Sequence, residues 1–318
     1  KARSAHIRIF AQSKIILIDA PLIRSLAMNM KLSFRLALIM LVIPCSLLVT
    51  FTHYPAIQAM INSFWNNGSS RRPSRFVGTD NYLTLIEDDR LMQVLFNSTI
   101  YAIGTIPLAI GLAIGMALLV NSRLPGTALM RLSFFMPTML PMIAVANIWL
   151  FFYAPGIGLA SQILEIFGLP SINFLGRTDT SLASMMFVAV WKEAGLFMIF
   201  YLAALQAVPT SLKDAARLEG ASSGRVFLDI VLPLLRPTTI FVAVNALINA
   251  FRLVDHVIVM TEGGPNNSSS LLLYYIYEVT FRQRDFAYGA TLTVLMVFTL
   301  GLLAIAQFWL LNRKAHYQ

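Results

Sequence analysis

The stretch that decides the fold is residues 94–120, VLFNSTIYAIGTIPLAIGLAIGMALLV, which contains no Asp, Glu, Lys or Arg. A helix needs about 20 mainly apolar residues to cross the hydrocarbon core of a bilayer, and this stretch exceeds that length. Unbroken apolar runs with internal Gly and Pro favour helices over the alternating strands of a β-barrel. Comparable runs lie at about 36–61, 130–153, 182–205, 238–260 and 289–311. The sequence therefore predicts an all-α, polytopic membrane helix bundle with six transmembrane helices.

The composition of the whole chain agrees with a membrane protein. Of 318 residues, 57% are hydrophobic and only 12% are charged, and the mean hydropathy is +0.70. A soluble domain takes roughly a quarter of its residues from the charged types, so a soluble enzyme and a nucleic-acid-binding protein are both disfavoured. The single cysteine, Cys45, excludes an intrachain disulfide and a cysteine-based metal site. We expect Pro44, Pro107, Pro137 and Pro141 to kink their helices.

The distribution of Lys and Arg predicts the orientation of the bundle. Fifteen of these residues lie on the side that holds both termini and the connections after the second and fourth spans, and seven lie on the other side. Because loops rich in Lys and Arg stay in the cytoplasm, both termini are expected there. The net charge of +9 is then explained by the basic residues that set the orientation of the chain and face anionic lipid. Two interpretations fit the N-terminal segment 1–35: an interfacial amphipathic helix around 15–18, or an ordered cytoplasmic extension.

The cytoplasmic connection 206–237 is long and has the pattern of folded structure. Ser211 precedes Asp214 by three residues, which is typical of a helix start capped by the serine. Gly220 is expected to end this helix, because glycine is favoured just after a helix C-terminus. A second helical stretch is expected at 222–231 and should end at Pro233. A slim helix with a charged rim suits insertion into a groove of a partner, and the alternative is a surface connection without a partner.

Residues 214–233, DAARLEGASSGRVFLDIVLP, carry a longer pattern within this connection. They resemble the "EAA" loop of binding-protein-dependent ABC importer permeases: Glu-Ala-Ala, three residues, Gly, nine residues, Ile, one residue, Leu-Pro. Every fixed position matches except the first, where Asp214 replaces Glu and keeps the charge. Further segments resemble carbohydrate-type permeases, such as those for maltose and glycerol-3-phosphate: 76–82 (FVGTDNY), 97–99 (NST), 190–192 (VWK), 204–209 (ALQAVP), and 263–265 (GGP) with 275–277 (YIY). The resemblance covers roughly residues 74–311.

The resemblance implies a type I ABC importer transmembrane fold in a bacterial inner membrane, and a transport subunit rather than an enzyme. The residues of the implied coupling helix, within 211–220, are Asp214, Ala215, Ala216, Glu219 and Gly220. The implied partners are a second, homologous permease subunit in a heterodimer, two cytoplasmic ATPase subunits, an extracytoplasmic solute-binding protein and membrane lipid, without nucleic acid. The chain itself would bind no cofactor, with ATP and Mg on the ATPase. Consistently, the sequence contains no Gly-x4-Gly-Lys-Ser/Thr phosphate loop.

Polar residues inside the predicted spans are the candidates for the transport pathway, because ionisable groups are costly in lipid. The fifth span contains Asn245, Asn249, Arg252, Asp255 and His256, whose spacing would place them along one face of a helix. Such a face would line a cavity and could bind a hydroxyl-rich substrate. The alternative is that Arg252 and Asp255 form an ion pair that only holds the bundle together.

Two further residues bear on the substrate. Lys192 lies mid-span in the fourth helix beside Glu193, and adjacent residues point about 100° apart on a helix, so we expect no direct pair. Lys192 is a candidate for the substrate pathway, although its match to the family pattern also favours a structural role. Similar permeases often have an uncharged residue near the position of Arg252. The guanidinium group of Arg252 could bind carboxylate or phosphate in a bidentate manner, which suggests an acidic cargo.

The sequence thus predicts the permease subunit of an ATP-driven, binding-protein-dependent importer of carbohydrate. An oligosaccharide is the favoured cargo, and acidic oligosaccharides are among the candidates. The alternatives are a sugar-phosphate importer, similar to those for glycerol-phosphate, and a secondary transporter, which would show inverted repeats with broken helices. The expected organisation is a cytoplasmic segment 1–35, a first transmembrane helix with its extracytoplasmic loop 36–93, a core permease domain 94–311 containing the coupling loop 206–237, and a cytoplasmic tail 312–318.

Overall fold

The computed structural model describes residues 7–9, 16–18, 36, 39–68, 73–122 and 124–312. The chain divides into two units, residues 1–61 and 62–318, which are described separately. The first unit contains a helix at Ile39–Asn62 that is long and apolar enough to cross a membrane, and none of its side chains is buried. This helix includes the π-helix η1 (Val49–His53) and α2 (Tyr54–Asn62).

Two short strands are the described part of the N-terminal segment. β1 (Ile7–Ile9) and β2 (Ile16–Ile18) pair in antiparallel fashion, with Ile7 opposite Ile18. An interfacial helix over 16–18 is therefore wrong, because these residues are extended. The rest of the expectation for residues 1–35 lies outside the described residues.

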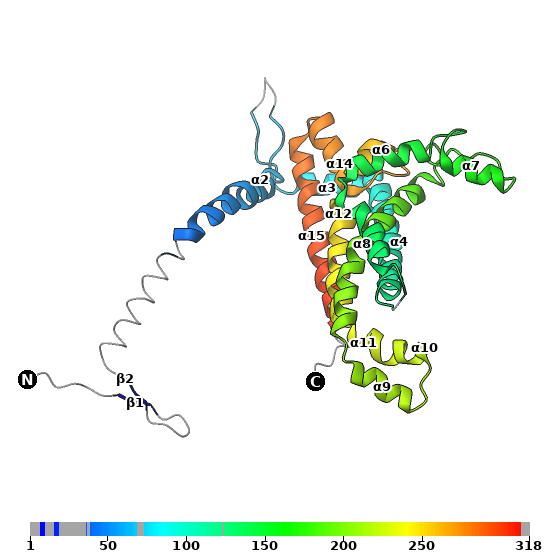
Figure 1. Ribbon diagram of the computed structural model, residues 1–318. Helices are drawn as coiled ribbons and strands as arrows, with labels where there is room; N and C mark the ends of the chain where they lie inside the picture. Colours follow the sequence, from blue (N-terminus) through cyan, green and yellow to red (C-terminus); the bar gives the residue numbers. More distant parts are fainter. Residues whose placement is uncertain are drawn as a thin grey trace, which may run out of the picture. The chain divides into compact units, whose positions relative to one another are not determined.

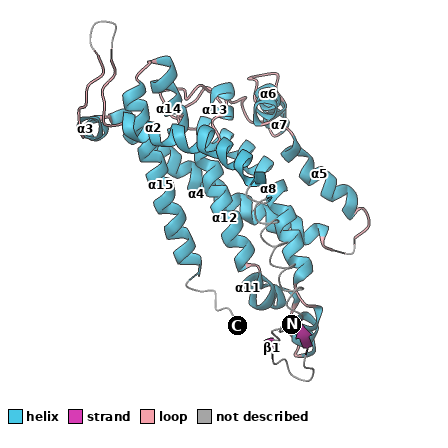
Figure 2. Ribbon diagram, turned by 90° about the vertical axis from the view of Figure 1, so that its left-hand side faces the viewer, coloured by secondary structure: helices cyan, strands magenta, loops and turns pink. Residues whose placement is uncertain are grey.

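The second unit is a bundle of long helices. Its main members are α4 (Asp89–Val120), α8 (Ser181–Ala207), α12 (Arg236–Arg252) and α15 (Phe286–Asn312). They run alongside one another in both views (Figure 1, Figure 2), and α4 packs along α8. Across the described residues, four helices can each cross a membrane and two bent helix pairs can supply two more spans. The prediction of an all-α membrane bundle is confirmed.

The third predicted span is broken into two helices. α5 (Thr127–Met139) and α6 (Met142–Phe152) meet at an angle of 103°. Leu140 is extended (ψ 139°), and Pro141, which has no N–H to donate, precedes α6. The kink expected at Pro141 is confirmed, but a continuous helix over 130–153 is wrong. Pro107, in contrast, lies inside the single helix α4.

The segment around the fifth predicted span is also interrupted. α10 (Ser223–Arg225), the π-helix η2 (Val226–Val231) and α11 (Leu232–Leu234) precede α12 and lie at 65° to it. Helix α12 ends at Arg252, and α13 (Asp255–Met260) follows an extended Leu253. The continuous helix expected up to residue 260 is therefore wrong, because the chain turns so that α13 packs on α6.

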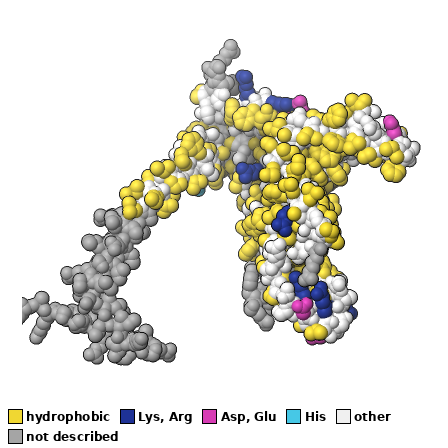
Figure 3. Space-filling view, viewed as in Figure 1, with side chains coloured by type: hydrophobic (Ala, Val, Ile, Leu, Met, Phe, Trp, Pro, Cys, Tyr) yellow, Lys and Arg dark blue, Asp and Glu magenta, His cyan; other side chains and the backbone are white. Residues whose placement is uncertain are grey.

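Two clusters of buried side chains form the core of the second unit. One joins α4, α6, the first half of α8, α13 and α14 (Leu272–Tyr277), and it includes Tyr101 and Tyr274. The other joins the second halves of α4 and α8 to η2 and α12, and it includes Phe197 and Tyr201. Yellow side chains cover the helices between the two ends of the bundle, whereas charged side chains concentrate toward the ends (Figure 3). This pattern fits a bundle surrounded by lipid.

The segments that were expected to be extracytoplasmic loops contain short helices. α3 (Asp80–Glu87) lies just before α4, and α7 (Leu159–Ile166) follows α6. The segment 263–285 includes α14 and the π-helix η3 (Glu278–Arg282). Helix α4 begins at Asp89, five residues before the predicted span, because Asp88 caps it: its carboxylate accepts a hydrogen bond from the Leu91 N–H at 3.0 Å.

Candidate functional site: a projecting helix and a cavity between spans

The first candidate site is α9 (Thr210–Leu218), a short helix that projects from the end of the bundle opposite α14 (Figure 1). Seven of its nine residues are exposed, on a helix that is flanked by the long helices α8 and α12 along the chain. The predicted Ser211 cap is wrong: the helix begins at Thr210, two residues before the expected start at Leu212, and no side chain caps it. Pro209 fixes its own backbone geometry and so starts the helix without a serine cap.

The C-terminal end of α9 is a Schellman motif, as the glycine predicted. Gly220 has a φ of +84°, its N–H donates to the Arg217 carbonyl at 3.0 Å, and the Ala221 N–H donates to the Ala216 carbonyl at 3.0 Å. This backbone conformation is costly for residues with a Cβ. Ala216 and Ala221 both pack against the core cluster that includes Phe197 and Tyr201. The motif therefore fixes both the length of α9 and its seat on the bundle.

The outward surface of α9 combines small, charged and apolar side chains. Asp214 and Arg217 form an exposed ion pair at 3.5 Å, and Ala215 and Glu219 are exposed. Leu218 is 90% exposed, the highest value among the large hydrophobic residues that the structure describes. Among the described residues, none covers this leucine. Basic and acidic side chains surround this part of the molecule (Figure 3).

The second candidate site is a cavity of about 140 Å³ between α5, α8 and α12. Its surface is mainly apolar, and it is called the polar cavity because four polar side chains also line it. Its lining includes Lys192, Glu193, Asn249 and Thr138. The carboxylate of Glu193 is hydrogen-bonded to the Asn249 side chain, and the Lys192 Nζ donates to the Thr138 carbonyl at 3.4 Å. Two predicted pathway residues, Lys192 and Asn249, thus come together with a carboxylate that was not among the predicted sites. Its signal in the sequence was an acidic residue in mid-span.

The other polar residues of the fifth span do not share one helix face, so that prediction is wrong. Asn245 donates to the Phe241 carbonyl of its own helix at 2.8 Å. Arg252 is exposed at the last position of α12, whereas Asp255 is half-buried at the first position of α13. The break at Leu253 separates them. The alternative of an Arg252–Asp255 ion pair is not found either, within the residues that the structure describes.

His256 lies in the core instead of a cavity. Its side chain is fully buried, and its Nε2 atom is 2.9 Å from the Tyr101 hydroxyl of α4. The Nδ1 atom has no hydrogen-bond partner among the described residues. His256 therefore connects α13 to α4 and is not placed to contact a substrate.

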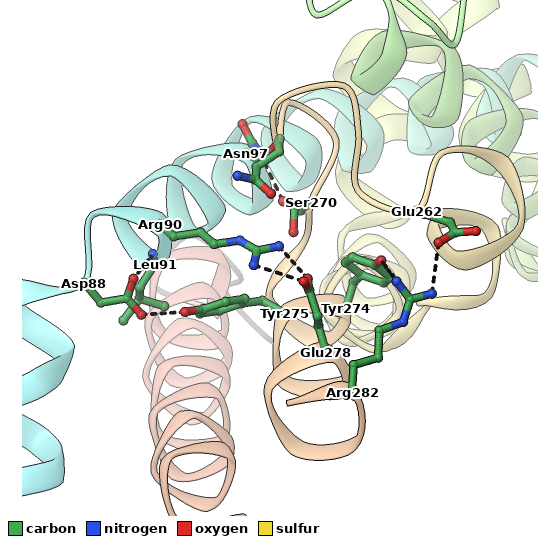
Figure 4. Close-up of polar contacts among 11 residues, drawn as sticks. Asp88, Arg90, Leu91, Asn97, Glu262, Ser270, Tyr274, Tyr275, Glu278 and Arg282 are labelled. Carbon is green, nitrogen blue, oxygen red and sulfur yellow. Dashed lines mark hydrogen bonds and ion pairs between the residues drawn. The ribbon is translucent and has the colours of Figure 1, made fainter. Parts of the chain in front are cut away.

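A polar network holds the opposite end of the bundle together (Figure 4). The Asp88 carboxylate accepts hydrogen bonds from the hydroxyls of Tyr275, at 2.7 Å, and Tyr288, at 2.5 Å. Arg90 forms a bidentate ion pair with Glu278 and stacks over the Tyr275 ring, 4.9 Å from its centroid. These contacts connect residues that are nearly 200 positions apart, such as Asp88 and Tyr288. No local sequence pattern could have predicted them.

Electrostatics favour the charged form of Asp88. Burial raises the pKa of this carboxyl, but hydrogen bonds from Tyr275, Tyr288 and the Leu91 and Arg90 amides outweigh burial, and the pKa lies below the ordinary value of 3.8. At neutral pH the charged Asp88 carboxylate is therefore the acceptor at the centre of this network.

Residues that carried the family resemblance belong to the same end of the bundle. Asn97 donates to the carbonyls of Asn267, at 2.7 Å, and Ser270, at 3.2 Å (Figure 4). Gly263 has a φ of +77°, and a Cβ there would lie 2.7 Å from the Tyr274 ring. These residues hold the backbone of the segment between α13 and α14 against α4.

Comparison with protein families and related sequences gives a consistent result. Residues 107–317 match the family described as "Binding-protein-dependent transport system inner membrane component". The sulfoquinovosyl glycerol transport system permease protein SmoG of Agrobacterium fabrum is 30% identical over 82% of this chain and 86% of its own length. The sn-glycerol-3-phosphate permease UgpA of Yersinia pestis is 30% identical over 88% and 95%, and the arabinooligosaccharides permease AraP of Halalkalibacterium halodurans is 30% identical over 82% and 83%.

Solved structures show the same fold. A chain of a bacterial ABC transporter involved in the import of the acidic polysaccharide alginate superimposes with a TM-score of 0.80. The match covers 92% of this chain and 100% of that chain, at 19% identity. A second structure of a bacterial alginate ABC transporter, in complex with an alginate pentasaccharide-bound periplasmic protein, gives a TM-score of 0.79 at 18% identity, covering 90% and 97%.

Proposed function

This chain belongs to the family of binding-protein-dependent transport system inner membrane components, and we propose that it is the permease subunit of an ATP-driven carbohydrate importer. As a member of this family it is a multi-pass inner membrane protein and a transport component. The observation that carries the proposal is α9, a capped and exposed helix between two long helices that has the family's coupling pattern.

In this proposal α9 docks into a groove of a cytoplasmic ATPase. Asp214, Ala215 and Glu219 would face the groove, and Gly220 would hold the end of the helix in position. The exposure of Leu218 supports this role, because a leucine exposed by 90% gains free energy when a partner covers it. ATP and Mg would be bound by the ATPase. Movement of the docked helix as a rigid body would transmit ATP-driven closure to the spans.

The partners and orientation follow from the same assignment. Both termini and α9 would lie in the cytoplasm, which is supported by the excess of Lys and Arg on that side. A solute-binding protein would deliver substrate at the end held by the Asp88 network. A second, homologous permease would complete the translocation pathway as a heterodimer, and two ATPase subunits would bind from the cytoplasm.

For the cargo we favour an oligosaccharide, with an acidic one as the specific candidate. The cavity beside Glu193 and Asn249 offers hydrogen-bond groups suited to hydroxyls. Arg252 is exposed one turn beyond Asn249 and is available to a carboxylate or phosphate. Named cargoes of the relatives include arabinooligosaccharides and sn-glycerol-3-phosphate. A sugar phosphate is therefore the second candidate.

The docking step can be tested with one pair of matched substitutions. Leu218→Asp places a charge on the docking surface of α9, and Leu124→Asp places the same charge at a 52% exposed leucine in another cytoplasmic connection. Affinity purification of the tagged chain in mild detergent should recover an ATPase and a second permease with wild type and with Leu124→Asp. The Leu218→Asp variant should lose the ATPase and keep the permease. Recovery of the chain alone from wild type would favour a secondary transporter and overturn the proposal.

The cargo can be tested in liposomes containing the complete complex. ATP hydrolysis should be measured with the solute-binding protein presented with an arabinotriose, an alginate trisaccharide or sn-glycerol-3-phosphate. If Arg252 recognises an acidic group, the anionic compounds stimulate hydrolysis in wild type and lose that effect in Arg252→Gln. Stimulation by the neutral saccharide alone, unchanged in Arg252→Gln, would exclude the acidic cargo and leave the importer assignment in place.

A further inference from the structure

We infer that Lys192 is a positioning residue that connects the polar cavity to the bend of the third span, so that cargo changes the angle between α5 and α6. The inference rests on the proposed transport function. It concerns a different step from ATPase docking, since Lys192 lies in the middle of α8 and not in the cytoplasmic loop.

The first observation is the C-terminal end of α5, a helix that packs on α8. The helix ends at Met139, and the extended Leu140 and the imino nitrogen of Pro141 cannot continue its hydrogen-bond ladder. Its last carbonyls therefore need other donors, because unsatisfied backbone groups are costly within a membrane. The Thr138 hydroxyl donates to the Phe135 carbonyl at 2.7 Å. The Thr138 carbonyl accepts from Lys192 Nζ at 3.4 Å.

Lys192 is therefore a cap for α5 that is contributed by another helix. A cation at a helix C-terminus is favoured by the negative end of the helix dipole. At 3.4 Å the contact between the Lys192 ammonium group and the Thr138 carbonyl is long for a hydrogen bond. A closer oxygen can therefore replace this carbonyl as the acceptor of the ammonium group.

The second observation is the contact between α8 and the last turn of α5, one turn beyond Lys192. A Cβ on Gly195 would lie 2.1 Å from the Phe134 carbonyl oxygen. The backbones of α5 and α8 can therefore come this close only because residue 195 is a glycine. Lys192 and Gly195 are three residues apart and share one face of α8. Together they seat the end of α5 next to its break.

The third observation is that the same Lys192 lines the cavity with Glu193 and Asn249. Its ammonium group can bind either of two acceptors: the Thr138 carbonyl or an oxygen atom of a cargo molecule in the cavity. A cargo that presents hydroxyl or carboxylate oxygens competes with that carbonyl for Nζ. Once Lys192 binds cargo, the end of α5 loses its cap and the angle at the break changes. Occupancy of the cavity is thereby transmitted to α6, on which α13 packs.

The experiment measures the bend directly in the assembled complex. On a Cys45→Ser background, spin labels at residues 132 and 148 replace Leu132 of α5 and Ile148 of α6, which are 57% and 47% exposed. Each label is seven residues from the break, about 10 Å along its helix. A change of about 20° in the bend then alters the distance between the labels by about 2 to 3 Å, given those arm lengths. The probe is the member of the saccharide panel described above that stimulates ATP hydrolysis most.

In wild type we expect the probe to shift the inter-label distance. In Lys192→Met the distance in the probe-free complex should already be shifted, and the probe should have no further effect. Lys192→Arg restores a cation and should restore the probe response. Probe-stimulated ATP hydrolysis should fall about tenfold in Lys192→Met, because a charged donor to a partly buried carbonyl is lost, with the KM for the loaded binding protein unchanged.

Glycine substitutions provide a second route if Lys192→Met fails to assemble. Gly195→Ala pushes the Phe134 carbonyl away and should shift the distance in the absence of probe. Gly111→Ala of α4 is the matched control, because a Cβ there meets nothing within 4 Å. The inference is overturned if Lys192→Met and Gly195→Ala both retain the wild-type distance and probe response.

The two proposals fail in different ways. If the wild-type complex retains its ATPase and second permease but the Lys192 variants behave as wild type, only this inference is lost. If no saccharide stimulates hydrolysis, the cargo assignment is lost, and the probe-free distances of Lys192→Met and Gly195→Ala still decide the role of Lys192 at the break.

Discussion

The two ends of the second unit are built in opposite ways. At the end that contains α14, Asp88, Tyr275, Tyr288, Arg90 and Glu278 bind one another across four helical segments. At the end that contains α9, the ion pair of Asp214 and Arg217 is exposed and the helix presents its largest apolar side chain outward. The first end completes its polar contacts within the chain, whereas the second leaves apolar surface for another protein. The difference identifies the α9 end as the one whose apolar surface is available to a partner.

Removing Asp88 should cause the largest loss in this comparison. Asp88→Ala deletes the acceptor of the Leu91 N–H and of two tyrosine hydroxyls. Leaving such donors unpaired should lower the free energy of unfolding by about 3 kcal/mol. Thermal unfolding in detergent measures this change. Asp89→Ala, an exposed neighbour in the same turn, is the control and should change stability by less than about 0.5 kcal/mol.

The Arg90–Glu278 pair should show the next largest effect. Removing either partner leaves a half-buried charge without its counterpart, and Arg90→Met or Glu278→Gln should each cost about 2 kcal/mol. The double variant should be less harmful than the sum, with a coupling energy of about 1 to 2 kcal/mol in a double-mutant cycle. Strictly additive losses would show that the pair contributes nothing to joining η3 to α4.

At the opposite end, Gly220→Ala should have a smaller and more local effect. A left-handed backbone costs a residue with a Cβ about 1 kcal/mol, and the Schellman motif of α9 depends on that conformation. Hydrogen exchange of the Ala221 amide should accelerate, with little change in global unfolding. Gly224→Ala is the matched control on the same loop, because φ is not positive there and a Cβ meets nothing within 4 Å. A global loss of stability would mean that α9 is part of the core.

The pH dependence of Asp88 should be the smallest effect. Its pKa in the folded state is lowered, so its contribution is fully present above the unfolded pKa of about 3.9 and is lost as the pH falls through the folded value. The stability difference between wild type and Asp88→Asn should therefore be constant from pH 7 to 5 and shrink below about pH 4. A difference that already shrinks between pH 7 and 5 would contradict a charged, well-bound carboxylate.

Sequence patterns predicted what depends on local chemistry. Apolar length identified the spans, and Gly220 and Pro141 marked a helix end and a break, because their backbone restrictions act whatever surrounds them. The break after Arg252 was missed, since it depends on the packing of α13 against α6 and not on a breaker residue. The two tyrosines that bind Asp88 were missed for the same reason: they are neighbours only in three dimensions. Helical periodicity therefore grouped Asn249 with His256, although the fold separates them.

The exposure of Leu218 has a consequence for how the protein is made. If α9 lies in the cytosol, as proposed, a subunit inserted before its partner arrives would display that leucine there, and unassembled proteins with exposed apolar side chains are bound by chaperones and proteases. The same residue that would be covered in the complex can thus report that assembly is incomplete. Cells that produce this chain in excess should accordingly degrade the surplus, and a pulse-chase comparison of wild type with Leu218→Asp, each produced alone, should find the aspartate variant longer-lived.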